Sequence, residues 1–236
     1  MKRLHWPQAA SGRHQVTGDR FHHLVRVLRV AVGEPLEVFD GHGHAFSAQV
    51  VQVGEQALEL ELSAPRAAPS ERAVWVVQAM PKADKLELVL QKATELGATG
   101  ISLAWSERCV VKPSERLEAK TARWAKILEE AARQCGRADV PALRGPVPLA
   151  QAVPDGALGL VLDEEERALP LGAAVAGHEG PLALVVGPEG GLTREEVAQL
   201  TARGARAVTL GARVLRTETA ALAALAVVRH LDGSLG

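Results

Sequence analysis

The carboxyl-terminal half of the chain alternates between short apolar runs and segments with a helical pattern, and this alternation limits the folds that it can adopt. Apolar runs at residues 158–162, 182–186 and 207–210 alternate with helical patterns at residues 193–203 and 217–231. Strands that alternate with helices form a parallel sheet whose faces the helices cover. The sequence therefore predicts an α/β domain with a parallel sheet in this half.

The hydrophobic period changes upstream, near residue 70. Apolar and polar residues alternate along residues 32–62, with glycines at the turns, which is typical of a small antiparallel sheet or barrel. A proline-rich stretch at residues 63–70 follows, and then a continuous apolar run at residues 74–77 and a helical pattern at residues 82–96. We therefore expect two domains, a small β-barrel at residues 1–69 and an α/β domain at residues 70–236.

The composition is that of an ordinary globular protein, with 47% hydrophobic and 23% charged residues among 236. The net charge of −1 argues against a protein that coats nucleic acid over its whole surface. The two cysteines lack the spacing of a zinc site, so we expect no metal and a reducing compartment. We also expect a cytoplasmic protein, since no apolar run approaches the roughly 20 residues of a membrane span and no leader resembles a signal peptide.

Two of the apolar runs break into loops that carry glycine and charged residues. The first loop, at residues 187–191, has the sequence GPEGG, and Thr193 and Glu196 after it have the spacing of a helix capping box. A glycine pair alone is often only a turn. The second segment, LGARVLRTETA at residues 210–220, holds more arginine and glutamate than a chain reversal requires. Because both loops follow strands of a parallel sheet, we expect them to line a ligand crevice at the carboxyl ends of the strands.

These two segments resemble the signature of the SPOUT class of S-adenosylmethionine-dependent RNA methyltransferases. They are most similar to the ribosomal small subunit methyltransferase E family, which methylates N3 of a uridine in 16S ribosomal RNA. The resemblance extends over nearly the whole chain, through His23-Leu24-Val25-Arg26-Val27-Leu28-Arg29, Phe39-Asp40-Gly41, Lys92-Ala93-Thr94-Glu95-Leu96-Gly97, Glu107-Arg108 and Arg133-Gln134-Cys135-Gly136-Arg137. Ala212 departs from the pattern, since the family often has proline there, but this change removes no chemical group.

The resemblance implies a specific architecture and set of partners. The amino-terminal domain is expected to be a PUA-like or OB-like barrel that binds RNA, and the second domain a SPOUT methyltransferase domain whose chain forms a deep trefoil knot. The resemblance further implies a homodimer with each active site near the subunit interface. It implies S-adenosylmethionine as the cofactor and small-subunit ribosomal RNA, or the assembled subunit, as the partner.

The cofactor would lie against the two loops. Backbone N–H and C=O groups can approach an adenine and a ribose closely where no Cβ intervenes, which favours glycine. Leucine and valine side chains would supply apolar walls. The residues that we predict to bind the cofactor are Leu162, Gly187, Pro188, Glu189, Gly190, Gly191, Leu210, Gly211, Val214, Leu215 and Thr217.

Catalysis would depend on holding the acceptor nitrogen in line with the methyl group. A uracil that loses its N3 proton carries negative charge flanked by two carbonyl oxygens, and arginine donors suit that charge. Arg216 is the first candidate, and Arg108, Arg133 and Arg137 from other segments are alternatives, although a salt bridge with Glu107 would also explain Arg108. Glu218 could orient Arg216 or act as base, but an acid in the first turn of a helix also interacts with the helix dipole.

Basic residues gather at the amino terminus and near the end of a helical pattern at residues 114–134. Residues 1–30 contain several arginines and histidines beside a single acidic residue, Asp19. Such a local excess suits RNA phosphates, although a solvated charged face has the same pattern. Arg133 and Arg137 are spaced one helical turn apart and should share a face. The residues that we predict to bind RNA are Arg20, His23, Arg26, Arg29, Arg133 and Arg137.

Three other functions fit parts of this pattern. A SPOUT enzyme could methylate a ribose 2′-oxygen instead of a base, because acceptor chemistry does not follow from residue spacing. A nucleotide-binding oxidoreductase or phosphatase could use the glycine loop, but the chain lacks both GxGxxG and GxxxxGK[ST]. A non-enzymatic RNA-binding module would need the basic amino terminus but not the charged loop near the carboxyl terminus.

Overall fold

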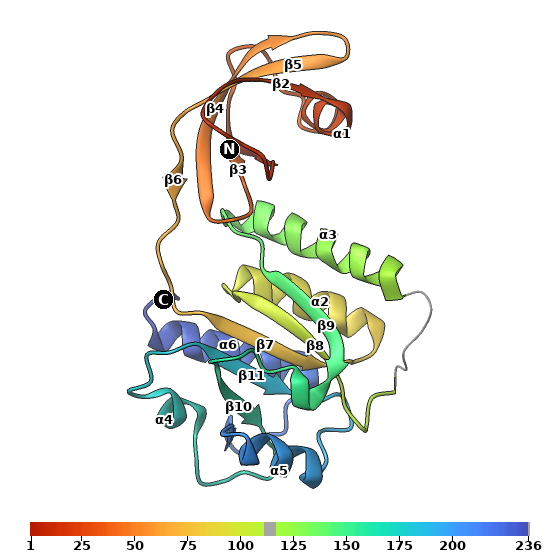
Figure 1. The fold of residues 1–236 in the computed structure, drawn as a ribbon, viewed down its shortest axis with the longest axis vertical. Helices are drawn as coiled ribbons and strands as arrows, with labels where there is room; N and C mark the ends of the chain where they lie inside the picture. The colour runs from red at the N-terminus through yellow and green to blue at the C-terminus, as the bar shows by residue number, and fades with distance from the viewer. Residues whose placement is uncertain (111–116, 236) are drawn as a thin grey trace. The chain divides into compact units, whose positions relative to one another are not determined.

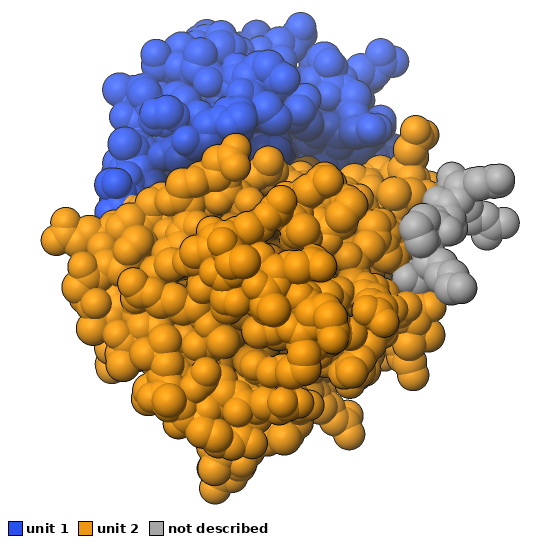
Figure 2. Space-filling model, turned by 60° about the horizontal axis from the view of Figure 1, so that its bottom comes forward, with its two compact units in different colours: residues 1–70, 132–140 blue, residues 71–131, 141–236 orange. Residues whose placement is uncertain are grey.

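The computed structural model describes residues 1–110 and 117–235 (Figure 1). The chain divides into two compact units, which Figure 2 distinguishes by colour. The first unit contains Met1–Ser70 together with Ala132–Val140, and the second contains Glu71–Ala131 and Pro141–Gly236. Nothing in the sequence pattern indicated that residues 132–140 belong with the amino-terminal unit.

The first unit is built on a six-stranded sheet in the order β1-β3-β4-β5-β2, with the short β6 paired to β4. The predicted antiparallel pairing along residues 32–62 is confirmed for β3, β4 and β5, whereas β1 pairs with β3 in parallel. A short helix and a π-helix follow β2. The elements are β1 Lys2–His5, β2 Gly12–Thr17, α1 Gly18–His22, the π-helix His23–Val27, β3 Pro35–Phe39, β4 His44–Val53, β5 Ala57–Leu62 and β6 Arg66–Ala67.

The core of this unit follows from the alternation in its strands. Leu58, Leu60 and Leu62 of β5 are buried, while the side chains between them are more exposed. The π-helix adds Leu24, which is fully buried in the same cluster. Alternate residues of a strand point to opposite faces, so one face of the sheet supplies the core and the other meets solvent.

Arg3 attaches residues 132–140 to the first unit. Its guanidinium donates to the carbonyl oxygens of Ala132 and Arg133, each at 3.1 Å, and of Arg137 at 2.9 Å. Its Nε donates to Glu37 Oε1 at 2.7 Å. The last carbonyl groups of a helix lack intrahelical partners, and a cation there satisfies them. Arg3 therefore has a structural role, in which its hydrogen-bonding groups face the protein.

The second unit contains a six-stranded sheet in the order β12-β10-β11-β7-β8-β9, in which every strand pair is parallel. The predicted parallel sheet is thus confirmed, although the sequence had not revealed β8 and β9. Its strands are β7 Val74–Ala79, β8 Gly100–Trp105, β9 Ala142–Pro148, β10 Leu158–Leu162, β11 Leu182–Val186 and β12 Arg206–Val208. All five residues of β11 are buried, as a strand covered on both faces requires.

Helices cover this sheet. Val161 and Val185 of the sheet pack with Val197 and Leu200 of α5, while α6 packs against β7, β11 and α2. The helices are α2 Ala83–Glu95, α3 Leu117–Cys135, α4 Leu171–Val175, α5 Arg194–Ala202 and α6 Thr217–Leu231, with a 3-10 turn at Leu149–Gln151. Within residues 1–110 and 117–235, no helix has both the length and the hydrophobicity needed to cross a membrane.

The bounds of α6 and the end of α3 can be compared with the helices predicted from the sequence. The bounds of α6 agree with the predicted helix at residues 217–231. Our expectation that Arg133 and Arg137 share a helix face is wrong, because α3 ends at Cys135 and Gly136 follows with a φ of 91°. The left-handed backbone of that glycine turns the chain before Arg137. The predicted start of this helix at Ser114 lies outside the described residues.

Candidate functional site

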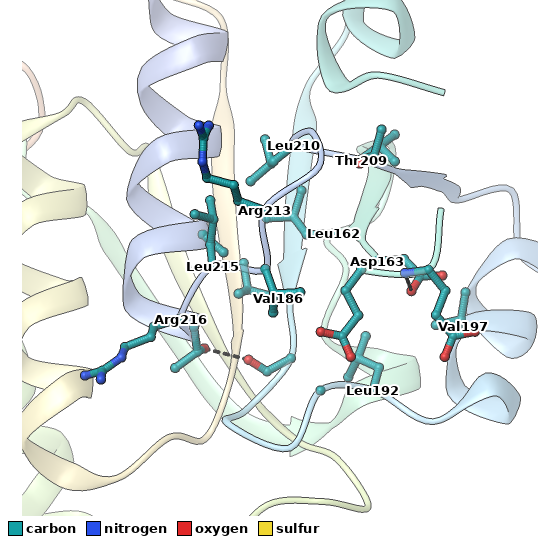
Figure 3. A pocket seen from close by; sticks show the side chains of 18 of the residues that line it. Leu162, Asp163, Val186, Leu192, Val197, Thr209, Leu210, Arg213, Leu215 and Arg216 are labelled. Carbon is teal, nitrogen blue, oxygen red and sulfur yellow. Dashed lines mark hydrogen bonds between the residues drawn. The ribbon is translucent and has the colours of Figure 1, made fainter. Parts of the chain in front are cut away.

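A cavity of about 390 Å³ opens at the carboxyl ends of β10, β11 and β12. It is lined by the loops that follow these three strands and by the first turn of α6 (Figure 3). Its volume falls within the range of small-molecule sites. The position agrees with the rule that ligands of open α/β sheets bind beyond the carboxyl ends of the strands.

The loop after β11, at residues 187–191, turns back sharply on itself. A Cβ added to Gly187 would lie 3.0 Å from both the Gly191 carbonyl carbon and the Leu192 nitrogen, and Gly191 has a φ of +70°. Glycine is favoured at both positions, at the first because an added Cβ would crowd the loop's own backbone and at the second because its backbone is left-handed. The N–H of Gly191 donates to the Pro188 carbonyl at 2.9 Å, which closes the turn.

The predicted capping box after this loop is confirmed. The N–H of Glu196 donates to Thr193 Oγ1 at 3.2 Å, and the N–H of Thr193 donates to Glu196 Oε2 at 2.9 Å. These bonds satisfy backbone donors that the first turn of α5 would otherwise leave unpaired. The loop is therefore anchored where it enters the helix.

Charged side chains anchor the outer side of the same loop. Arg108 donates from Nη1 to the Gly190 carbonyl at 2.9 Å, and Glu189 Oε1 accepts from the Lys82 N–H at 3.1 Å. Burial alone would raise the pKa of Glu189, but hydrogen bonds from its own N–H, from the Lys82 N–H and from Lys85 outweigh burial and hold the pKa below its usual value. Glu189 is therefore ionised at neutral pH.

The loop after β12 is far more exposed. Thr209 Oγ1 accepts from the Gly211 N–H at 3.1 Å, and beyond it residues 211–214 are all exposed. In Figure 3, Leu162, Val186, Leu210 and Leu215 gather on one side of the pocket, and the guanidinium of Arg216 points away from them. The pocket thus has an apolar wall and an arginine that reaches beyond it.

A buried hydrogen-bond chain joins the two loops. Thr217 Oγ1 donates to the Gly187 carbonyl at 2.6 Å and accepts from Gln78 Nε2 at 2.9 Å (Figure 3 shows the first bond). Gln78 is fully buried in β7. Sequence reasoning missed Gln78, although a polar residue inside the apolar run of β7 was a signal, because buried amides need hydrogen-bond partners.

An ion pair lies beside the loop that follows β10. Arg194 donates from Nη1 and Nη2 to the two oxygens of Asp163, at 2.8 and 2.6 Å. The bond from Arg194 lowers the pKa of Asp163, burial opposes this shift, and the Glu165 N–H lowers the pKa further. Both side chains line the pocket, and the sequence analysis overlooked them. An acid directly after a parallel strand could have pointed to Asp163.

The structure brings most of the predicted cofactor and catalytic residues to this one cavity. Two of them do not line it: Gly190, where an added Cβ would lie 3.3 Å from Arg108 Cβ, and Glu218, whose Oε2 lies 3.5 Å from Lys85 Nζ. The predicted residues that line it are Arg108, Leu162, Gly187, Pro188, Glu189, Gly191, Leu210, Gly211, Val214, Leu215, Arg216 and Thr217.

The residues that we predicted to bind RNA all belong to the first unit. Arg26 and Arg29 are exposed, and His23 is half-buried. The guanidinium carbon of Arg20 lies 6.0 Å from the centre of the Trp6 ring. Arg137 pairs with Asp139 at 2.5 Å, so its charge is already compensated within the unit.

No metal centre is evident in the part of the chain that the structure describes. Within residues 1–110 and 117–235, no group of three or more His, Cys, Asp and Glu side chains is placed to hold an ion.

Comparisons with known proteins agree over nearly the full length. Residues 68–229 match the RNA methyltransferase domain family, and residues 16–63 match the RNA methyltransferase PUA domain family. The chain is 41% identical over 225 residues to the ribosomal RNA small subunit methyltransferase E of Mycobacterium bovis, covering 90% of this chain and 84% of the relative. The Bacillus subtilis protein of the same name is 32% identical over 236 residues, with 91% and 89% covered.

A solved structure is similar in fold as well as in sequence. It is the ribosomal RNA small subunit methyltransferase E of Neisseria gonorrhoeae bound to S-adenosyl methionine. It aligns with a TM-score of 0.87 and 34% identity over 98% of both chains.

Proposed function

The chain belongs to the ribosomal RNA small subunit methyltransferase E family, and we propose that it transfers the methyl group of S-adenosylmethionine to N3 of a uridine in 16S ribosomal RNA. The observation that carries this function is the cavity at the carboxyl ends of β10, β11 and β12, where both family segments meet. The homologous enzyme that binds the same cofactor supports the assignment.

The pocket residues fit this cofactor. Gly187 lets the first loop fold back on itself, and Gly191, where an added Cβ would meet only Glu164 Oε1 at 4.0 Å, leaves the backbone open to the close approach of an adenine or a ribose. Leu162, Leu210 and Leu215 would pack against the apolar parts of the nucleoside. When bound, the cofactor supplies an electrophilic methyl group on a positively charged sulfonium. The chain supplies the shape that holds it.

Arg216 would serve the nucleobase. It directly precedes Thr217, which the buried chain through Gly187 fixes at the edge of the cofactor loop. A guanidinium so placed can donate to the uracil carbonyl oxygens beside N3 as the N3 proton leaves, and donors aimed at developing charge lower the barrier. Most of the remaining acceleration would come from alignment of the acceptor with the methyl group.

Arg108 and Glu218 would have supporting roles at the site. Arg108 lines the pocket and donates to the Gly190 carbonyl, so it would hold the cofactor loop. Glu218 follows Arg216 by two residues in the first turn of α6, and its Oε2 is buried without a hydrogen-bond partner among the described residues. It would orient the arginine or receive the N3 proton.

The rest of the proposal concerns assembly and RNA. We propose that residues 1–69 form a closed PUA-like barrel and that residues 70–236 form a SPOUT domain with a trefoil knot. Two copies would associate with each active site near the interface, in the cytoplasm, where ribosomes are built. The RNA would contact the first unit, to which Arg20, His23, Arg26, Arg29, Arg133 and Arg137 all belong, and the exposure of Arg26 and Arg29 supports this.

Mass spectrometry of the product tests the function. The protein is incubated with labelled S-adenosylmethionine and small subunits from cells that lack this modification, and the 16S RNA is then digested to nucleosides. We expect the label in N3-methyluridine and none with Arg216→Ala. Label in a ribose-methylated nucleoside would favour the 2′-oxygen alternative, and unlabelled RNA would refute the proposed function.

A further inference from the structure

We propose that Lys85 is a positioning residue, which sets the spacing of the two pocket loops by bridging Glu189 of one loop to Glu218 beside the other. This inference rests on the proposed function, because the loops are those that would hold the cofactor and the acceptor arginine. Lys85 would act through the two carboxylates and would not contact the reacting atoms.

Lys85 lies in the first turn of α2 and lines the cavity. Its Nζ is 3.3 Å from Glu189 Oε1 and 3.5 Å from Glu218 Oε2. The exposed fractions of the three side chains are 22% for Lys85, 23% for Glu189 and 14% for Glu218. Charges with so little exposure are screened less by salt than surface pairs are.

The position of Lys85 is unusual for a lysine. The amino-terminal turn of a helix carries partial positive charge and favours acids over bases. Glu189 satisfies this preference, since it accepts from the Lys82 N–H at the start of α2. A cation at the same helix end is therefore explained by the two carboxylates that flank it and not by helix formation.

Lys85 is more important for Glu218 than for Glu189. Its Oε2 is buried without a hydrogen-bond partner among the described residues, and Lys85 is the cation beside it. A buried charge that loses its counter-ion destabilises its surroundings. Without Lys85, Glu189 and Glu218 would face each other as like charges, since both lie within 3.5 Å of the same nitrogen. Their repulsion would separate the loops.

The two loops already have one link, through Gln78, Thr217 and Gly187. That chain is buried and joins the base of one loop to the start of α6. The Lys85 bridge joins the same two segments at other residues, at Glu189 in the loop after β11 and at Glu218 in α6. Loss of the bridge should therefore leave the protein folded. It should lower the affinity for the cofactor and make the position of Arg216 less well defined.

Calorimetric titration with S-adenosylmethionine tests the bridge without any measurement of activity. Lys85→Met should weaken cofactor binding about tenfold, which is the scale of one lost electrostatic coupling. Lys85→Arg should retain binding to within about threefold, because it restores the charge. Lys92→Met is the matched control, since Lys92 lies in the same helix and pairs with Glu95 at 2.9 Å, outside the cavity. It should bind as the unaltered protein does.

A second variant separates charge from packing. In Lys85→Met combined with Glu218→Gln, one of the two facing carboxylates is neutral, so binding should recover most of the loss. A role of the lysine stem in packing alone would give no recovery, and this result would overturn the bridge. Thermal unfolding of each variant identifies any that fails to fold, and Lys85→Gln then replaces Lys85→Met.

Failure of this inference and failure of the proposed function give different results. If the unaltered protein binds the cofactor and Lys85→Met binds it equally well, the inference is wrong and the proposed function stands. If the unaltered protein does not bind S-adenosylmethionine, the proposed function is wrong, and this inference with it.

Discussion

The two loops of the pocket are held in very different ways. The loop after β11 is fixed by the turn from Gly191 to Pro188, by Arg108 on Gly190 and by the capping box at Thr193. In the loop after β12, residues 211–214 are exposed, and Val214 is 72% exposed. One half of the pocket is thus held by several hydrogen bonds of its loop, whereas the loop of the other half is largely exposed to solvent.

This difference implies a division of labour between the loops. A preorganised loop loses little conformational entropy on binding, so it suits the part of the site that recognises the cofactor. Segments with exposed backbone and few buried apolar contacts open at low free-energy cost. The loop after β12, which ends at Arg216, would become ordered when the cofactor covers it and would then present the arginine to RNA.

The largest expected effect comes from the exposed loop. Arg216→Ala should lower the rate of methyl transfer by about 100- to 1,000-fold, the range for loss of one donor to developing charge. Cofactor affinity should change little, because the apolar wall and the glycine loop remain. Single-turnover kinetics and calorimetry measure the two quantities. The control is Arg123→Ala, because Arg123 is an exposed arginine of α3 that pairs with Glu87. Equal losses of affinity and rate would contradict the division of labour.

The link between the loops should show the next largest effect. Thr217→Val removes the hydroxyl that joins Gly187 to Gln78 and leaves buried polar groups unpaired. The free energy of unfolding should fall by about 2 kcal/mol, as measured by urea denaturation. Thr217→Ser retains the hydroxyl and should lose less than half as much. If serine and valine were equally destabilising, the hydrogen bonds would not be the cause.

The capping box should contribute less. Thr193→Ala removes the side chain that accepts from the Glu196 N–H, and loss of an N-cap costs about 1 kcal/mol. The same urea titration measures this loss, and Thr193→Ser should recover most of it. An unchanged midpoint for the alanine variant would mean that this loop is held mainly by its other contacts.

The smallest effect concerns pH. The bond from Arg194 places the pKa of Asp163 below its ordinary value, so the ion pair stabilises the folded state above the unfolded-state pKa of about 4. This contribution is lost as the pH falls from there through the folded-state pKa. Asp163→Asn should therefore reduce stability at pH 7 by about 1 kcal/mol or less, because Arg194 is half exposed. Its stability should also decline less between neutral and acidic pH. A variant that keeps the full acid dependence would contradict this assignment.

Local signals in the sequence predicted the pocket better than they predicted its supports. The capping box and the bounds of α6 depend on residues close together in the chain, and both were predicted. Gln78 and Lys85 reach their partners across more than a hundred residues, to Thr217 and Glu218. Which polar residues meet at such separations depends on the order of the strands in the sheet. No single segment of the sequence determines that order, so these contacts could not be predicted.

Contacts between residues far apart in the chain were also missed in the first unit. Arg3 is one of the basic residues of the amino-terminal segment, yet it binds carbonyl groups in the last turn of α3 and the Arg137 carbonyl just after it. Its partners lie some 130 residues away and are backbone atoms, so no side-chain pattern marks them. Gly136 also ends the helix before Arg137, although the arginine spacing alone is compatible with one helical face.

Amide hydrogen exchange with and without S-adenosylmethionine tests the central claim most directly, because it observes both loops in one experiment. We predict slow exchange at Gly191 and through the start of α5 in both states, and a change from fast to slow exchange along residues 210–216 when the cofactor is added. Exchange along residues 210–216 that is unaffected by saturating cofactor would contradict the claim that these two loops form its binding site.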